Sequence, residues 1–373
     1  MLTLTFYVFF EIVALFFMYS AQRKRKKYKI KNTKRDNVLI VKKYYGYLFL
    51  SAFPIIFLLG FRDISVGYDT KEYVYTFFRI ANGSIIASDY AWLSYGYIFI
   101  CKIIGFFSKN GYLLYNLIIA VLTIYFFYKA LWRNSKNPVF SLFLLFSTCL
   151  VYQAFNQSRQ MLAVAIITYS WGFLEKEDLK KYLILIFLAF TIHKSAIIML
   201  PFYWLSKRKI SKKNIFIYIG IALLFLFSLN FIEKILFFTH YGQVYLEKGM
   251  FISQTSSILN LVFRCCVLFI CSFFYRYIQA NDKIKLNKLM NISIWCVLFQ
   301  LLTLKIYIFA RITTYLYVFY VFLISNIYEN IKNKKKKQIF IIIMCLIFLI
   351  FHIGYYNSVS HSSGYDVYKF IFN

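Results

Sequence analysis

Residues 332–353 read KNKKKKQIFIIIMCLIFLIFHI, a basic cluster followed directly by an apolar run. An α-helix needs roughly twenty apolar residues to cross the hydrocarbon core of a membrane. Similar runs recur along the chain, which is 61% hydrophobic and 22% aromatic. Because hydrocarbon offers the backbone no hydrogen bonds, repeated runs of this kind must be helical. The sequence therefore predicts an all-α, polytopic membrane protein of about 11–13 helices, some of them broken or re-entrant.

The formal net charge of +30 is concentrated in a few places. Most of the 44 lysines and arginines fall in six short linkers, at residues 23–43, 129–136, 176–181, 207–213, 283–288 and 332–337. Basic residues in short loops mark the cytoplasmic side of a membrane. We interpret the block RKRKKYKIKNTKR at 23–35 as an anchor against anionic membrane lipid. Nucleic acid is not an expected partner.

The linkers divide one integral membrane domain, residues 1–373, into four parts. These are a first helix at 2–20, a basic cytoplasmic linker at 21–43, a polytopic core at 44–353 with an outer loop at 61–92, and an outer-face tail at 354–373. No basic residue precedes the first apolar run, so we expect a retained helix rather than a signal peptide. The seven cysteines lie in apolar stretches without a CxxC pair, and predict neither disulfides nor a zinc site.

Two regions do not fit simple spans. Residues 182–206 lie between two basic linkers that are both expected on the cytoplasmic side, so this segment must cross the membrane an even number of times. It has too few residues for two full membrane spans. We expect two half-helices broken near His193–Lys194, with Pro201 in the second. Residues 93–108 are expected to form an outer-surface or re-entrant helix, and 111–128 a span. The other predicted spans are 44–60, 138–155, 159–174, 214–232, 257–278, 289–308, 312–328 and 338–353.

With the linkers inside the cell, the remaining polar clusters fall on the outer face. They are Arg62–Glu72, Asn156–Gln160, Thr191–Ser195, Arg311 and the tail HSSGYDVYKF, and all four histidines lie on the same side. The linkers alone fixed this arrangement, so the gathering of polar groups on one face is an independent observation. It favours a site at the outer leaflet.

Three arginines are candidates for binding an anion. Arg159 lies between two apolar segments among three amide side chains, which favours a polar cavity, and guanidinium binds phosphate through paired hydrogen bonds. The alternative for Arg159, and for Arg311 near a turn, is a helix-end arginine that reaches the lipid headgroups. Arg264 lies inside its helix, where a charged side chain usually faces a partner or a cavity.

His193 and Asp69 are candidates for moving a proton. Histidine suits proton transfer near neutral pH, although a purely structural histidine is the alternative. Asp69 lies in GFRDISVGYDTKEY (60–73), where Gly67 permits a tight turn, and a solvated loop with local ion pairs is the alternative. Asp69 follows Asp63 too far along the chain for a metal-binding pair, and no HxH or HxxxH occurs. We therefore expect no metal.

Several short motifs occur in a set order. They are R-x(3–6)-G-x-D-T-x-x-Y (Arg62, Gly67, Asp69, Thr70, Tyr73), SYGYIF at 94–99, N-x-x-RQ (Asn156, Arg159, Gln160), H-x-SA (His193, Ser195, Ala196), a late arginine before a tyrosine (Arg311, Tyr315), and the tail GYDVYKF. Over about residues 44–370 this order resembles the EpsG/Wzy family of bacterial polysaccharide polymerases. Two departures are GYDT in place of the more usual GTDT, and Asp89 in place of an acid directly before the SYGY-like segment.

The resemblance implies a GT-C-like fold and a reaction at the outer (periplasmic) face of the bacterial inner, or cytoplasmic, membrane. A growing chain would pass from its undecaprenyl-pyrophosphate carrier to a new undecaprenyl-pyrophosphate-linked oligosaccharide repeat. The departing lipid pyrophosphate is already an anion, so arginines can stabilise it without a metal or another cofactor.

The resemblance also implies roles for individual residues. Arg159 and Arg311 are expected on the pyrophosphate, and His193 or Asp69 as the group that activates the acceptor hydroxyl. Arg62 with Tyr73 is expected to position the substrate, and Asn156 and Gln160 to bind it. From its position inside a helix, rather than from the resemblance, Arg264 is also expected to bind substrate. A chain-length regulator and a flippase are possible protein partners.

Other functions stay open at this point. A transporter or flippase for lipid-linked oligosaccharides is one alternative, although this chain shows no internal repeat and has one acid, Glu11, clearly inside a span. An O-antigen ligase is the nearest enzymatic alternative. For a polymerase, O antigen is the preferred product, followed by capsule or exopolysaccharide.

Overall fold

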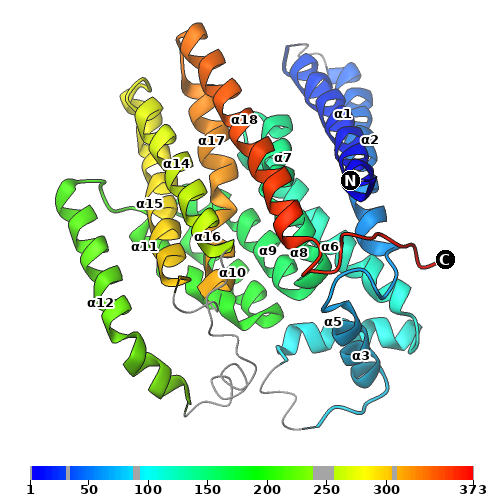
Figure 1. Ribbon diagram of the computed structural model, residues 1–373. Coiled ribbons are helices and arrows are strands. Elements are labelled where there is room, and N and C mark those ends of the chain that lie inside the picture. The colour runs from blue at the N-terminus through cyan, green and yellow to red at the C-terminus, as the bar shows by residue number, and fades with distance from the viewer. Residues whose placement is uncertain (1, 31–33, 87–92, 238–255, 305–308, 373) are drawn as a thin grey trace. The chain divides into compact units, whose positions relative to one another are not determined.

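The computed structural model describes residues 2–30, 34–86, 93–237, 256–304 and 309–372 (Figure 1). The helices are α1 (Leu2–Ile30), α2 (Lys34–Gly60), α3 (Thr70–Ala81), α5 (Tyr95–Phe107), α6 (Tyr112–Asn134), α7 (Pro138–Ser147), α8 (Leu150–Asn156), α9 (Ser158–Glu175), α10 (Leu179–Ile192), the 3-10 helix η1 (Lys194–Met199), α11 (Phe202–Leu205), α12 (Lys212–Phe237), α14 (Ser256–Tyr275), α15 (Ala280–Leu302), α16 (Phe309–Tyr317), α17 (Phe319–Asn330) and α18 (Lys334–Val359). Asp89, His240 and parts of the predicted segments at 87–92, 238–255 and 305–308 lie outside the described residues.

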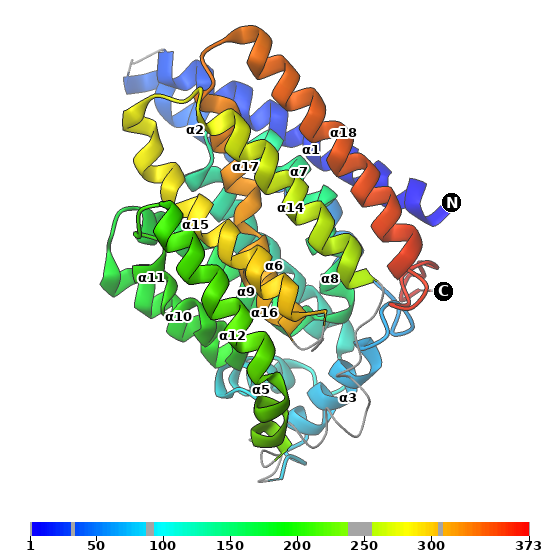
Figure 2. The same ribbon diagram turned by 60° about the vertical axis from the view of Figure 1, so that its left-hand side comes forward.

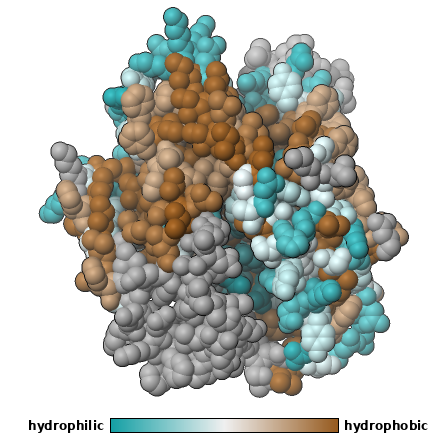
Figure 3. All heavy atoms as spheres, in the orientation of Figure 1, coloured by the Kyte–Doolittle hydropathy of each residue, from teal (hydrophilic) through white to brown (hydrophobic). Residues whose placement is uncertain are grey.

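The predicted all-α, polytopic membrane fold is confirmed. Within the described ranges, five helices are long and apolar enough to cross a membrane, or six if the bent pair α7–α8 counts as one span. Large apolar side chains such as Phe16, Phe269 and Ile350 are exposed on these helices. Figure 3 shows apolar side chains over broad areas of the visible face. Lipid would cover such surfaces in a membrane.

The chain forms two compact units. The first comprises Met1–Ile197 and Cys345–Asn373, and the second comprises Ile198–Met344. In the first unit α1 lies against α2, and α9 lies between α6 and α10 (Figures 1 and 2). Helix α9 is buried on nearly all sides, as expected for a helix that is apolar all round. Ser51 ties three helices together: its hydroxyl donates to Ala14 O at 2.6 Å, and its carbonyl accepts from the Tyr128 hydroxyl at 2.8 Å.

The basic linkers are more helical than expected. Helix α1 continues through the basic residues after position 20 as far as Ile30, and α2 already begins at Lys34. Helix α15 likewise includes the basic residues 283–288. Lysine and arginine are good helix formers, so a span that reaches water can continue as a helix.

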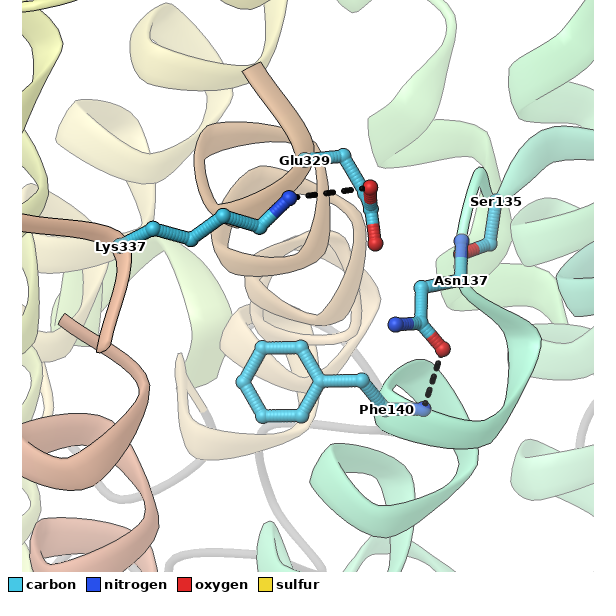
Figure 4. A network of polar contacts seen from close by, with 5 residues as sticks. All are labelled: Ser135, Asn137, Phe140, Glu329 and Lys337. Atoms are coloured by element: carbon cyan, nitrogen blue, oxygen red, sulfur yellow. Dashed lines mark hydrogen bonds and ion pairs between the residues drawn. The ribbon is translucent and has the colours of Figure 1, made fainter. Parts of the chain in front are cut away.

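The predicted single span at 138–155 is instead a bent pair. Asn137 begins α7 by accepting a hydrogen bond from Phe140 N at 3.2 Å (Figure 4), with Pro138 in the first turn. Helices α7 and α8 meet at 49°. Between them Cys149 has a left-handed backbone, with φ of 58°. A helix cannot pass straight through such a residue, and cysteine gives no sequence signal for it.

The predicted break at His193–Lys194 is confirmed. Helix α10 ends at Ile192, His193 is extended with φ of −146°, and the 3-10 helix starts at Lys194. Pro201 then precedes the short helix α11. Helix α5, at 13 residues, is also too short to span a membrane, which confirms that 93–108 is not a full span, while its outer-surface or re-entrant placement stays a prediction.

The second unit is built around α15, which lies against α12, α14, α16 and α17. The Tyr320 hydroxyl of α17 reaches Ser293 O at 3.3 Å and Arg264 O at 3.4 Å, and so connects α15 and α14. The predicted segment 312–328 consists of two helices that meet at Val318. Lys337 and Glu329 form an ion pair at 3.3 Å between the start of α18 and the end of α17 (Figure 4).

Candidate functional site

The loop after α2 is fastened to the C-terminal tail. Asp63 N donates to Lys369 O at 2.9 Å and Ile371 N to Phe61 O at 3.0 Å, on either side of an antiparallel bridge between Arg62 and Phe370. Further along, Gly67 N donates to Gly364 O at 2.7 Å. Figure 1 shows the tail running beside this loop. Both segments were expected on the outer face, but their pairing was not predicted.

The same loop rests on the end of α8. The Thr70 hydroxyl donates to Phe155 O at 3.1 Å. Asn156 uses both ends of its amide: Nδ2 donates to Ser363 O at 2.8 Å, and Oδ1 accepts from Asp69 N at 3.3 Å. The predicted substrate-binding residue Asn156 therefore joins the loop, the tail and α8.

Gly67 is required at this junction for two separate reasons. Its φ is +87°, and a Cβ added there would lie 2.5 Å from Phe155 O, a backbone atom that cannot move aside. Gly83 also has a positive φ, +72°, but a Cβ there would meet nothing within 4 Å. The two glycines therefore separate backbone strain from steric collision.

Gly67→Ala is expected to lower the melting temperature of the purified protein more than Gly83→Ala does. Both substitutions carry the left-handed strain of about 1–3 kcal/mol, and only Gly67→Ala adds the collision with Phe155. Thermal unfolding in detergent, followed by tryptophan fluorescence, makes the comparison. Equal shifts for the two variants would show that the loop can move away from α8 at little cost.

Arg62 lies beneath the tail and is only 3% exposed. One guanidinium nitrogen donates to Leu59 O, and the group lies 5.7 Å from the centre of the Phe155 ring. Burial lowers the pKa of Arg62 to about 10, with the phenols around it, Tyr73 among them, acting in the opposite direction. Arg62 therefore remains a cation at neutral pH. Its expected role in positioning the substrate, together with Tyr73, stays a prediction.

Arg159 lies in the first turn of α9, directly after the joint with α8. Its guanidinium carbon is 5.1 Å from the centre of the Tyr97 ring, and its Nε has no hydrogen-bond partner among the described residues. Gln157 precedes the helix without capping it through its side chain. The first N–H groups of a helix lack partners within it and attract anions. Gln160, also predicted to bind substrate, follows in the same turn and is buried.

His193 is held by a neighbour two residues away. Its Nδ1 and the Ser195 hydroxyl lie 2.7 Å apart. Such a contact fixes the ring orientation, and the tautomer it selects decides which nitrogen can accept a proton. This contact gives a physical reason for the serine of the H-x-SA motif, since Ser195 orients the His193 ring.

The first turn of α5 connects the Arg159 and His193 regions. A Cβ on Gly96 would lie 2.5 Å from the Thr191 hydroxyl, so α5 approaches the end of α10 closely, two residues before His193. The next residue, Tyr97, lies under Arg159, and its hydroxyl is 2.8 Å from that of Tyr115. The SYGY segment therefore contacts both Arg159 and the end of α10 that precedes His193, an arrangement that the sequence motif alone did not reveal.

Asp69 precedes α3 and is half-buried, but its side chain does not cap that helix. The segment at 60–73 thus places Asp69 beside Asn156, within the same corner of the first unit as Arg62 and the end of α8. Across the ranges that the structure describes, no group of three or more His, Cys, Asp and Glu residues is placed to hold a metal ion.

The remaining two predicted arginines belong to the second unit. Arg264 is 6% exposed; it donates to the Gln300 amide oxygen and lies 4.3 Å from the centre of the Tyr317 ring. Arg264 Nε has no hydrogen-bond partner among the described residues. Arg311 is half-buried in α16. The expectation that Arg264 faces a partner inside its helix bundle agrees with its contact to Gln300.

Taken together, the helices and the arginine-containing joint between α8 and α9 define a multi-pass membrane protein with a built polar site in its first unit. The chain belongs to the EpsG family, whose model matches residues 44–372. Membership confirms the resemblance drawn from the motifs and indicates a polysaccharide-polymerase-like role. No curated protein and no solved structure matches the chain.

Proposed function

We propose that this protein is a metal-independent membrane glycosyltransferase that polymerises polysaccharide. It would join undecaprenyl-pyrophosphate-linked oligosaccharide repeats at the outer face of the cytoplasmic membrane. O antigen is the favoured product, ahead of capsule or exopolysaccharide. The observation that carries the proposal is the position of Arg159, in the uncapped first turn of α9 with a guanidinium nitrogen unpaired among the described residues.

That position suits the leaving group of the reaction. The acceptor hydroxyl oxygen attacks the anomeric carbon of the donor chain, and the bond from that carbon to the pyrophosphate oxygen breaks. The electron pair of the broken bond stays on the pyrophosphate, where Arg159 and the N-terminus of α9 stabilise the charge. The hydroxyl proton passes to His193 or Asp69, and undecaprenyl pyrophosphate leaves.

A deletion strain tests this function directly. Without the protein, cells of the native host are expected to accumulate single lipid-linked repeats on the outer leaflet and to lack long chains. The purified full chain, supplied with that repeat, should release undecaprenyl pyrophosphate as longer chains appear. Gel electrophoresis of the saccharide and mass spectrometry of the lipid measure both products.

The alternatives give different deletion phenotypes. Loss of a flippase would leave the repeats on the inner leaflet, and loss of a ligase would leave long chains attached to the undecaprenyl carrier. Either pattern would overturn the proposed polymerisation. Labelling of a Tyr68→Cys variant with a membrane-impermeant reagent checks the outer-face placement of the loop, because Tyr68 is 77% exposed.

A further inference from the structure

Several buried polar atoms where α8 meets α9 lack hydrogen-bond partners. Among the described residues these are Gln153 Oε1 and Gln157 Oε1, beside the Nε of Arg159. A buried polar group left unpaired is unfavourable, and native proteins pair nearly all of them. Such a concentration at one joint calls for an explanation other than packing.

The two glutamines and Arg159 lie close together along the chain, at the joint between α8 and α9. Gln153 and Gln157 are four residues apart, and Gln157 N donates to Gln153 O at 2.7 Å, so their side chains share a face of the helix. Ser158 is the first residue of α9 and is 4% exposed. Arg159 follows directly.

Neighbouring amides show what structural glutamine and asparagine side chains do in this unit. The Asn156 amide forms hydrogen bonds with the backbone of Ser363 and of Asp69. The Gln22 amide oxygen accepts a hydrogen bond from Val139 N at 3.1 Å. Gln153 and Gln157 have no such tie for their amide oxygens within the described residues. They are therefore available for a ligand.

The unpaired atoms match two halves of one ligand. Amide oxygens accept hydrogen bonds, which sugar hydroxyls donate. The guanidinium and the helix N-terminus donate hydrogen bonds, which phosphate oxygens accept. We infer that Gln153 and Gln157 bind hydroxyl groups of the sugar attached to the diphosphate that Arg159 holds. The inference rests on the proposed function and assigns residues for substrate recognition at the same site.

A binding experiment with two probes separates the sugar contacts from the phosphate contacts. The probes are undecaprenyl pyrophosphate, which carries no sugar, and the lipid-linked repeat extracted from the deletion strain. The purified full chain in nanodiscs is compared with Gln153→Ala/Gln157→Ala, with Arg159→Ala, and with Gln338→Ala, an exposed glutamine in the second unit. Thermal unfolding of each variant establishes that it is folded, and single substitutions replace the double one if it is not.

The double glutamine variant is expected to bind undecaprenyl pyrophosphate within twofold of wild type but to bind the sugar-bearing repeat at least about tenfold more weakly. Arg159→Ala should weaken both probes, and Gln338→Ala neither. Unchanged binding of the repeat by the double variant would overturn the sugar subsite while leaving the phosphate site intact. Equal weakening of both probes by the double variant would also overturn it. Normal binding by Arg159→Ala would instead defeat the proposed function.

Discussion

Arg159→Ala is expected to leave the protein in the membrane and to abolish long surface polysaccharide. Loss of one group that stabilises developing charge typically slows a reaction by about a hundredfold to a thousandfold. Because a long chain requires many successive additions, slowing each addition strongly reduces the yield of long polysaccharide. The measurement is a polysaccharide gel from the deletion strain complemented with the variant, alongside an immunoblot of its membranes.

Arg159→Lys separates geometry from charge. Lysine keeps the positive charge but cannot present the paired donors of guanidinium, so we expect it to fail as well. Arg276→Ala is the matched control, because Arg276 is an exposed arginine at the end of α14. A normal ladder from Arg159→Ala would remove this arginine from the reaction, and full activity of Arg159→Lys would reduce its role to a point charge.

His193→Ala should slow polymerisation by about a hundredfold to ten-thousandfold if His193 is the base that takes the acceptor proton. Ser195→Ala should have a smaller effect of the same kind, because it releases the ring without removing it. The rate of undecaprenyl pyrophosphate release by purified protein is the measurement.

Asp69→Asn distinguishes the two candidate bases. A large loss of rate with Asp69→Asn, together with a mild effect of His193→Ala, would assign the proton to Asp69. His361→Ala serves as the control, since His361 is an exposed histidine paired with Asp366 at 2.8 Å on the tail. We expect that variant to polymerise normally.

Hydrophobic runs and basic linkers were enough to predict the membrane class and several helices. The break at His193 was also predictable from the sequence. Residues 182–206 must cross the membrane an even number of times, and they are too few to form two full membrane-spanning helices. The ordered motifs identified the family. These features depend on length, charge and local pattern, which a sequence displays directly.

Features set by contacts between distant segments were not predictable. The bend at Cys149 depends on a left-handed residue that could equally have continued a helix. The pairing of residues 61–68 with 363–371 joins segments far apart in the sequence, and neither segment carries a strand pattern. The unpaired amide oxygen of Gln153 became visible only once its neighbours were known, although its spacing from Gln157 was present in the sequence.

The tail that covers Arg62 also sets the order in which the protein can mature. Arg62 emerges from the ribosome early, whereas residues 363–371, which pair with its loop, are translated after all the helices described above. Until that segment has been made, Asp63 N and Phe61 O lack their hydrogen-bonding partners. A premature stop before residue 363 would therefore yield a chain that keeps the candidate spans of the described ranges but has an unfinished loop after α2.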